Sequence, residues 1–258
     1  AVLVGTVIQL GWVALQVAHL DPLFQATVPQ SGPAPAFVEP VGWMGNPMDL
    51  ALLLGVSLPL LLAVRPRWLG RAVAALTALT MLLGLRTTVG AMAVGVTALW
   101  MLWEPLASWR WLRQATVVLI ALAGVLYVLV WDPHVGSRPL IWKQAGHLIG
   151  LRPFAGWGPN AVDHRLLLLT PKTELRWNFI FNEWLQAWLE LGMLAPALAV
   201  GYLVTLARRL RGRWREAGEL PAVAAIVLLA SCFSIPFRIG PVALVAALAL
   251  GQLERRLT

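Results

Sequence analysis

The chain has 258 residues, of which 59% are hydrophobic and only 12% are charged, and its mean hydropathy is +0.74. Soluble domains average about 25% charged residues, so this composition argues against a soluble enzyme, a disordered chain and a fibrous protein. It favours an integral membrane protein. The single cysteine, Cys232, lies in an apolar run, which leaves no disulfide framework.

The apolar runs predict an all-α, polytopic membrane protein with about eight transmembrane helices. A spanning helix needs about 20 apolar residues, and the runs cover residues 1–20, 48–64, 72–85, 89–103, 115–131, 184–206, 220–236 and 239–253. Several are short, so they require tilt or a locally thin bilayer. Prolines crowd residues 21–47 and predict a loop there.

The formal net charge of +8 is explained by membrane topology and not by a nucleic-acid partner. Alternating spans place residues 65–71, 104–114, 208–219 and 254–258 on one side, and these four segments carry twelve arginines. The positive-inside rule makes that side, with the C-terminus, cytoplasmic. The chain then divides into helices with an outer loop (1–131), a large outer loop (132–183) and the last helices (184–258).

Eight basic residues remain on the outward side, where the rule expects few: Arg86, Arg138, Lys143, Arg152, Arg165, Lys172, Arg176 and Arg238. Arg86 and Arg238 lie at or near the outer ends of spans. An arginine at membrane depth is costly unless it is paired or faces water, so both are candidates for binding an anion. The alternative is that they snorkel to the lipid headgroups.

The outer loop contains an expected amphipathic helix followed by a glycine-rich turn. Apolar residues recur at helical spacing over residues 138–150, and Pro153 should end the helix. The backbone amides of the turn PFAGWGPN could approach phosphate oxygens closely. His164, later in the loop, is a candidate general base, although scattered histidines are more often plain surface residues.

Polar residues gather where the loop enters the sixth predicted span. Glu183 and Glu190 are one heptad apart and share a helix face. Because Glu190 lies two turns into an apolar helix, we expect it to be paired or to line a cavity, and the outward arginines are available as partners. An interhelical hydrogen bond is the alternative. The sequence contains no metal-ligand cluster and no nucleotide motif, so we expect no cofactor.

These segments resemble the O-antigen ligase and O-antigen polymerase superfamily. The stretch SRPLIWKQAGHLIGLRPFAGWGPN (137–160), followed by FNEWLQAWLELGMLA (181–195), is similar to that family's outer helix, Pro-x-x-Gly-x-Gly turn and His-Asn start of the next span. Further similarities are GNPMDLALLLGVSLPLLL (45–62) and GLRTTVGAMAV (84–94). The matching residues are Arg86, Arg138, Trp142, Pro153, Gly156, Gly158, Asn182, Leu185, Gln186, Glu190 and Gly192.

Two residues depart from the family pattern. Phe181 stands where the family has the histidine usually assigned to catalysis in the ligases, and Ala195 replaces the last glycine. The family also usually has more spans. Either another residue, His164 or Glu183, serves as the base, or the acceptor differs, or the chain is an inactive relative.

The resemblance implies a bacterial inner-membrane glycosyltransferase. Such an enzyme transfers a glycan from undecaprenyl diphosphate to a hydroxyl acceptor, which could belong to a lipid A core, a glycan or a protein. Expected catalytic residues are Arg138, His164 and Glu183; expected substrate-binding residues are Arg86, Trp142, Arg152, Asn182, Gln186, Glu190 and Arg238. The alternatives are an inactive subunit that binds a polyprenyl-linked glycan and a small-solute transporter.

Overall fold

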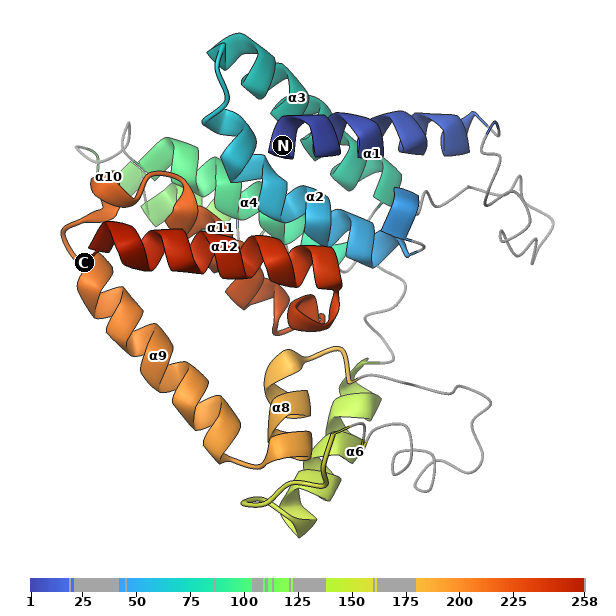
Figure 1. Ribbon diagram of the computed structural model, residues 1–258, viewed down its shortest axis with the longest axis vertical. Helices are drawn as coiled ribbons and strands as arrows, with labels where there is room; N and C mark the ends of the chain where they lie inside the picture. Colours follow the sequence, from blue (N-terminus) through green and yellow to red (C-terminus); the bar gives the residue numbers. More distant parts are fainter. Residues whose placement is uncertain are drawn as a thin grey trace. The chain divides into compact units, whose positions relative to one another are not determined.

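The computed structural model (Figure 1) describes residues 1–18, 20, 42–44, 46–85, 87–103, 109, 111–112, 114–120, 122, 138–159, 161 and 180–257. All secondary structure assigned in these residues is helical, which confirms the predicted all-α class. The chain forms two compact units, residues 1–132 with 222–226 and residues 133–221 with 227–258. The predicted division at residues 131 and 183 concerns membrane topology and stays a prediction.

The first unit is built around helix α2 (Pro47–Leu62), which contacts α1 (Val2–Val17), α3 (Arg67–Leu79) and α4 (Thr88–Trp103). The Asn46 side chain caps α2 by accepting from the Met48 amide at 2.8 Å, and Pro47 occupies the first turn, where no amide donor is needed. A π-helical turn, η2 (Thr80–Leu85), extends α3. A short 3-10 helix, η1 (Gly42–Met44), is held to α1 by the Gln16 side chain.

The second unit contains α6 (Arg138–Leu151), α8 (Glu183–Leu191), α9 (Leu194–Leu210), α10 (Trp214–Ala217) and α12 (Gly240–Leu257). Helix α11 (Leu220–Ala230) divides between the units by residue, and a short 3-10 helix, η5 (Pro236–Arg238), connects it to α12. Arg213 donates to the backbone carbonyls of Arg256 and Leu257, which fixes α10 against the end of α12. This unit carries the described candidate site residues.

The helix predicted over residues 138–150 is confirmed, whereas the sixth predicted span is not one helix. Helix α6 begins at Arg138 and ends at Leu151, two residues before Pro153. The apolar run 184–206 breaks at Gly192, whose φ of 78° is incompatible with a continuing right-handed helix. The seventh predicted span also ends early, because α11 stops at Ala230 and a turn follows. Of the fifth, only residues 115–120 and 122 are described, and they are helical.

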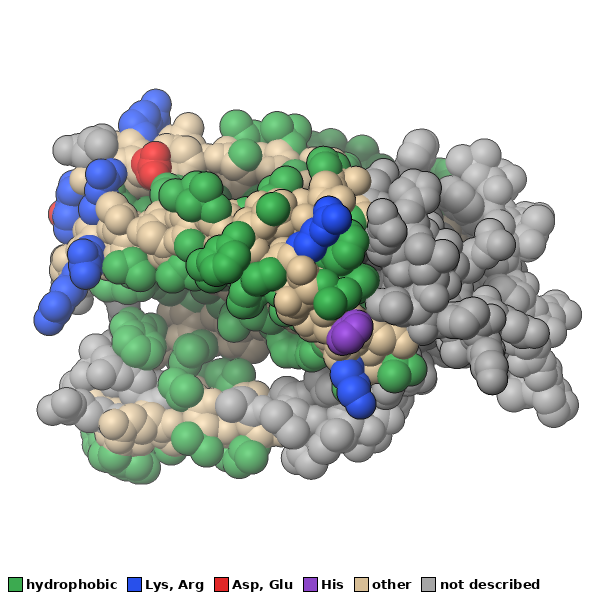
Figure 2. Space-filling model, turned by 90° about the horizontal axis from the view of Figure 1, so that it is seen from below, with side chains coloured by type: hydrophobic (Ala, Val, Ile, Leu, Met, Phe, Trp, Pro, Cys, Tyr) green, Lys and Arg blue, Asp and Glu red, His purple; other side chains and the backbone are tan. Residues whose placement is uncertain are grey.

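One described helical stretch, Arg67–Leu85, is long and apolar enough to cross a membrane. Four other apolar helices, α1, α2, α4 and α11, have between 11 and 16 residues. A helix of 16 residues extends about 24 Å, shorter than a typical hydrocarbon core. On the face seen in Figure 2, hydrophobic side chains cover much of the part that the structure describes. Large exposed ones in the described chain include Leu194 and Leu198, each more than 60% exposed.

Candidate functional site

Helices α6 and α8 pack together around a small apolar core that positions the polar residues. The core consists of Ile141, Ala145, Leu148, Ile149, Ile180 and Leu189. The four residues from α6 lie at helical spacing on one face, as the sequence predicted, whereas Leu140 is 56% exposed. Arg138 lies on the buried face, one turn before Trp142, and only 4% of its surface is exposed.

The glycine-rich turn after α6 binds the end of α8 through its backbone amides. Trp157 N donates to Leu189 O at 2.8 Å, and Gly158 N donates to Glu190 O at 2.9 Å. In return, Met193 N donates to Pro153 O at 2.9 Å. The expectation that these amides approach a phosphate is therefore wrong for Trp157 and Gly158, because both satisfy carbonyls at a helix end.

Two glycines make this contact possible. Gly156 and Gly192 have φ values of 66° and 78°, which side-chain-bearing residues rarely adopt. A Cβ atom on Gly156 would lie 2.6 Å from Glu190 O, and one on Gly192 would lie 1.9 Å from Phe154 O. The turn and the end of α8 thus form one rigid contact in which neither glycine can carry a side chain.

Three tryptophans fasten the same region by donating their indole N–H groups to backbone carbonyls. Trp142 Nε1 donates to Ile180 O at 3.0 Å, Trp157 Nε1 to Leu148 O at 2.8 Å, and Trp188 Nε1 to Pro153 O at 2.9 Å. The ring of Trp142 also contacts Phe233, with centroids 6.2 Å apart. Trp142 therefore joins α6 both to the start of α8 and to the segment that follows α11.

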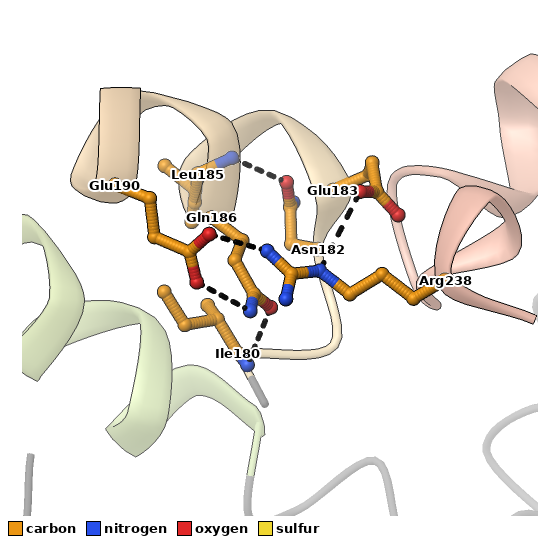
Figure 3. A network of polar contacts seen from close by, with 7 residues as sticks. All are labelled: Ile180, Asn182, Glu183, Leu185, Gln186, Glu190 and Arg238. Carbon is orange, nitrogen blue, oxygen red and sulfur yellow. Dashed lines mark hydrogen bonds and ion pairs between the residues drawn. The ribbon is translucent and has the colours of Figure 1, made fainter. Parts of the chain in front are cut away.

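Three charged side chains and one amide lie together between α8 and η5 and are called the Arg238 cluster: Glu183, Gln186, Glu190 and Arg238 (Figure 3). Arg238 Nη2 is 2.5 Å from Glu190 Oε2, and Arg238 Nε is 3.9 Å from Glu183 Oε1. Gln186 Nε2 donates to the other Glu190 oxygen at 3.0 Å. Gln186 Oε1 accepts from Ile180 N at 3.3 Å.

Asn182 fixes the start of α8 against the segment that follows α11. Its Oδ1 caps α8 by accepting from Leu185 N, and its Nδ2 donates to Cys232 O, both at 3.0 Å. The next backbone amide, Glu183 N, donates to Ser231 O at 2.8 Å. These bonds bring Arg238, which follows seven residues after Ser231, beside the carboxylates of α8.

Burial raises the pKa of the Glu183 carboxyl above its ordinary value of 4.5. The positive charge of Arg238 and a hydrogen bond from the backbone of Phe237 lower the pKa of Glu183, and the negative charge of Glu190 raises it further. Glu183 Oε2 is buried and has no hydrogen-bond partner among the residues that the structure describes. A partly buried carboxylate with one unpartnered oxygen can accept a proton or a hydrogen bond from a ligand.

The structure brings most of the expected site residues into one unit. These residues come from α6, from α8 with its cap residue, and from η5, and bonds made by Trp142, Asn182 and Arg238 connect the three segments: Arg138, Trp142, Asn182, Glu183, Gln186, Glu190 and Arg238. Arg152 is exposed at the glycine-rich turn, where its guanidinium lies 4.4 Å from the centre of the Trp157 ring. Arg86 and His164 lie outside the described residues.

Glu190 and Gln186 are buried, with 5% and 1% of their surfaces exposed. The sequence predicted that Glu190 would be paired or would line a cavity, and in the structure it forms an ion pair with Arg238. Sequence reasoning missed the backbone of Ile180, Ser231 and Cys232, since carbonyls and amides carry no residue-specific signal. It also missed Trp157 and Trp188, although the Gly-Trp-Gly spacing around Trp157 marks a constrained turn.

Phe181 adopts a left-handed backbone conformation, with φ of 54°, between the buried Ile180 and the cap residue Asn182. Its side chain packs against the α6–α8 core. Phe181 is therefore an apolar contact of this core.

No protein-family model, curated protein or solved structure matches this chain. Within the described part of the chain, no three His, Cys, Asp or Glu residues lie together as a metal site would require.

Proposed function

We propose that the protein is a membrane glycosyltransferase of the O-antigen ligase and polymerase type. It would transfer a glycan from undecaprenyl diphosphate to a hydroxyl acceptor at the outer face of the bacterial inner membrane. The observation that carries the proposal is the meeting of three segments singled out in the sequence. Trp142 on α6 is bonded to Ile180 before α8, Asn182 at the start of α8 to Cys232, and Glu190 on α8 to Arg238 on η5. Arg138 lies one turn before Trp142 on the buried face of α6.

The reaction needs positive charge near the leaving group and a base near the acceptor. The hydroxyl oxygen of the acceptor forms a bond to the anomeric carbon, while the bond from that carbon to the phosphate oxygen breaks. The lipid diphosphate leaves with the electron pair, and the hydroxyl proton passes to the base. Fixed arginines can stabilise the diphosphate without a metal ion.

Glu183 is the best-supported base among the described residues. It is 18% exposed, its pKa is raised by burial, and Oε2 has no hydrogen-bond partner in the described part of the chain. A raised pKa brings a carboxylate closer to the range in which it accepts protons efficiently. Arg138 and Arg152 are the described candidates for the diphosphate, and Arg86 and His164 remain sequence predictions.

The proposal includes the eight-span architecture with a cytoplasmic C-terminus. Its support is the apolar composition, the exposed hydrophobic side chains and the basic segments at residues 65–71 and 208–219. Single cysteines in place of Lys143 and Glu254, in a Cys232→Ala background, would test it with a membrane-impermeant thiol reagent. Labelling from outside at position 143 alone is expected. Labelling of both positions, or of position 254 alone, would contradict the topology.

The catalytic proposal is tested by assaying glycan transfer from a polyprenyl-diphosphate donor with purified protein. Arg138→Ala should reduce turnover at least a hundredfold, because losing a charged group that stabilises a transition state costs about 3 kcal/mol. Lys143→Ala is the matched control, since Lys143 is exposed on the same helix. Unchanged turnover by a folded Arg138→Ala protein would remove Arg138 from the site.

A second candidate is a catalytically inactive subunit that binds a polyprenyl-linked glycan. The packing of Phe181 against the α6–α8 core favours it, because no histidine occupies that position. Transfer by the wild type that is lost in either Glu183→Ala or His164→Ala would support the enzyme and identify its base. Absence of transfer with every acceptor, together with retained donor binding and a gain of activity in Phe181→His, would support the inactive subunit.

A further inference from the structure

We propose that Arg238 is a positioning residue and not a ligand of the lipid diphosphate. The buried Glu190–Gln186 pair fixes Arg238, and Arg238 orients Glu183. The inference rests on the proposed function and changes the role that the sequence suggested for Arg238, Gln186 and Glu190. It makes the Glu183 side of the site a place for an uncharged hydroxyl acceptor, separate from the binding of the diphosphate.

The guanidinium of Arg238 has a carboxylate on each of two sides. Its terminal Nη2 is engaged by Glu190, and its Nε side faces Glu183 (Figure 3). The planar guanidinium has donors in fixed directions, so contacts on two sides determine its orientation. Arg238 therefore sets where the Glu183 carboxylate lies, and leaves Glu183 Oε2 as the oxygen without a partner in the described residues.

Both oxygens of the Glu190 carboxylate have hydrogen-bond partners. One of its oxygens accepts from Gln186 Nε2 and the other from Arg238 Nη2. Gln186 is in turn fixed by the Ile180 amide, which donates to its Oε1. A carboxylate that is 5% exposed cannot give up its cation without a large cost, because an uncompensated buried charge is strongly destabilising. Arg238 is therefore not available to a substrate that would have to displace Glu190.

The net charge of the Arg238 cluster also disfavours a diphosphate. Two carboxylates on one guanidinium leave the Arg238 cluster with a net charge of −1 when all three groups are ionised. Like charges at close range disfavour each other strongly in a partly buried site, so a diphosphate would be repelled here. An acceptor hydroxyl is uncharged and donates a hydrogen bond, which suits Glu183 Oε2.

The acceptor step then follows directly. The hydroxyl oxygen of the acceptor attacks the anomeric carbon while its proton passes to Glu183 Oε2. The bond from the anomeric carbon to the phosphate oxygen breaks, and the diphosphate leaves with its electron pair. Arg238 touches neither the sugar nor the diphosphate. Its effect on the rate is exerted through the orientation and the proton affinity of Glu183.

The first experiment follows the protonation of Glu183 by pH-dependent infrared difference spectroscopy of the detergent-solubilised protein. The carboxyl band absent from Glu183→Gln and retained in Glu219→Gln belongs to Glu183. Arg238→Gln should move its titration midpoint upward, because an opposite charge is removed. Glu190→Gln should move it downward, because a like charge is removed and Arg238 is released to Glu183.

Opposite shifts from two neighbouring substitutions are not expected from a local loss of structure. They also require no turnover, so they test the inference even if the protein proves to be no transferase. An unchanged midpoint in Arg238→Gln, or shifts of the same sign in both variants, would overturn the positioning role.

The second experiment measures the binding of farnesyl diphosphate, a soluble analogue of the donor lipid. Arg238→Gln should bind it within twofold of the wild type, whereas Arg152→Ala should bind at least tenfold more weakly. In the transfer assay Arg238→Gln should lower kcat with the donor KM unchanged, and Arg238→Lys should restore part of the kcat. A loss of affinity in Arg238→Gln equal to that in Arg152→Ala would make Arg238 a diphosphate ligand and overturn the inference.

Discussion

Glu190 on α8 and Arg238 on η5, 48 residues apart in the chain, form an ion pair with 2.5 Å between Oε2 and Nη2. Glu190 is buried in the turn of α8 that the glycine-rich turn also binds, because Gly158 N donates to its carbonyl. Glu190 thus contacts two neighbouring segments. Its backbone joins α8 to the turn after α6, and its side chain joins α8 to η5.

Removing the cation of this pair should be more damaging than removing the whole pair. Arg238→Ala leaves the Glu190 charge buried, and we expect a loss of about 3 kcal/mol in the free energy of unfolding, the low end for a buried pair since Arg238 is partly exposed. Arg238→Leu combined with Glu190→Leu should recover most of that loss. Unfolding in mixed detergent micelles measures both. A double variant less stable than Arg238→Ala would contradict the account.

The contact between the glycine-rich turn and α8 should not tolerate a methyl group at Gly192. Gly192→Ala would place Cβ 1.9 Å from Phe154 O at a φ of 78°, so we expect a loss of about 2 kcal/mol or more. Gly146→Ala is the matched control: this glycine lies within α6 and a Cβ there would meet nothing within 4 Å. It should stabilise the protein by about 1 kcal/mol. Equal effects of the two substitutions on the unfolding midpoint would show that the turn adapts.

The sequence predicted local structure well where the signal is local. The apolar spacing over residues 138–150 predicted α6 to within one residue at its end, because a helical face is specified by neighbours three and four positions apart. The break at Gly192 was not predictable in the same way. A glycine within an apolar run is compatible with a continuous helix, and the close approach of Phe154 and Ala155 to Gly192 is a tertiary contact.

The candidate site was predictable in its residue types and not in its pairing. The position of Glu190 in an apolar helix predicted a partner or a cavity, but several arginines could have supplied the partner, and only the fold selects Arg238. The glycine-rich turn illustrates the opposite error. Its amides resembled a phosphate-binding loop, yet the carbonyls at the end of α8 need the same donors, and the structure uses them there.

Asn182 should contribute more to stability than an ordinary helix cap. Its Oδ1 caps α8 and its Nδ2 also bonds Cys232 O, whereas Asn46 only caps α2. We expect Asn46→Ala to cost about 1 kcal/mol and Asn182→Ala about 2 kcal/mol, since one more hydrogen bond is lost. The difference between the two unfolding free energies measures the bond to Cys232. Equal costs would mean that this bond contributes nothing.

At position 181 glycine should stabilise the protein more than alanine, the reverse of their usual order in stability. At a φ of 54° alanine is strained and glycine is not, so Phe181→Gly should be more stable than Phe181→Ala by about 1 kcal/mol. Both variants lose the same contacts of the ring with the α6–α8 core. At the exposed helical position Lys143 the order should be normal, with alanine better by about 1 kcal/mol. If alanine proves better at both positions, Phe181 carries no strain in solution.

Glu183 should give the protein a stability that falls as the pH rises. Its pKa in the folded protein is raised above the ordinary value of 4.5, mainly by burial, so the folded state holds the proton more tightly than the unfolded state. The stabilisation by this proton is fully present below pH 4.5 and is lost as the pH rises through the folded-state pKa.

Glu183→Gln should abolish this part of the pH dependence, because the amide resembles the protonated acid and does not titrate. The free energy of unfolding of the wild type minus that of Glu183→Gln should therefore decrease from pH 4.5 upward and then level off. An increasing difference would mean that the ion pair with Arg238 outweighs burial, and that the folded-state pKa lies below its ordinary value.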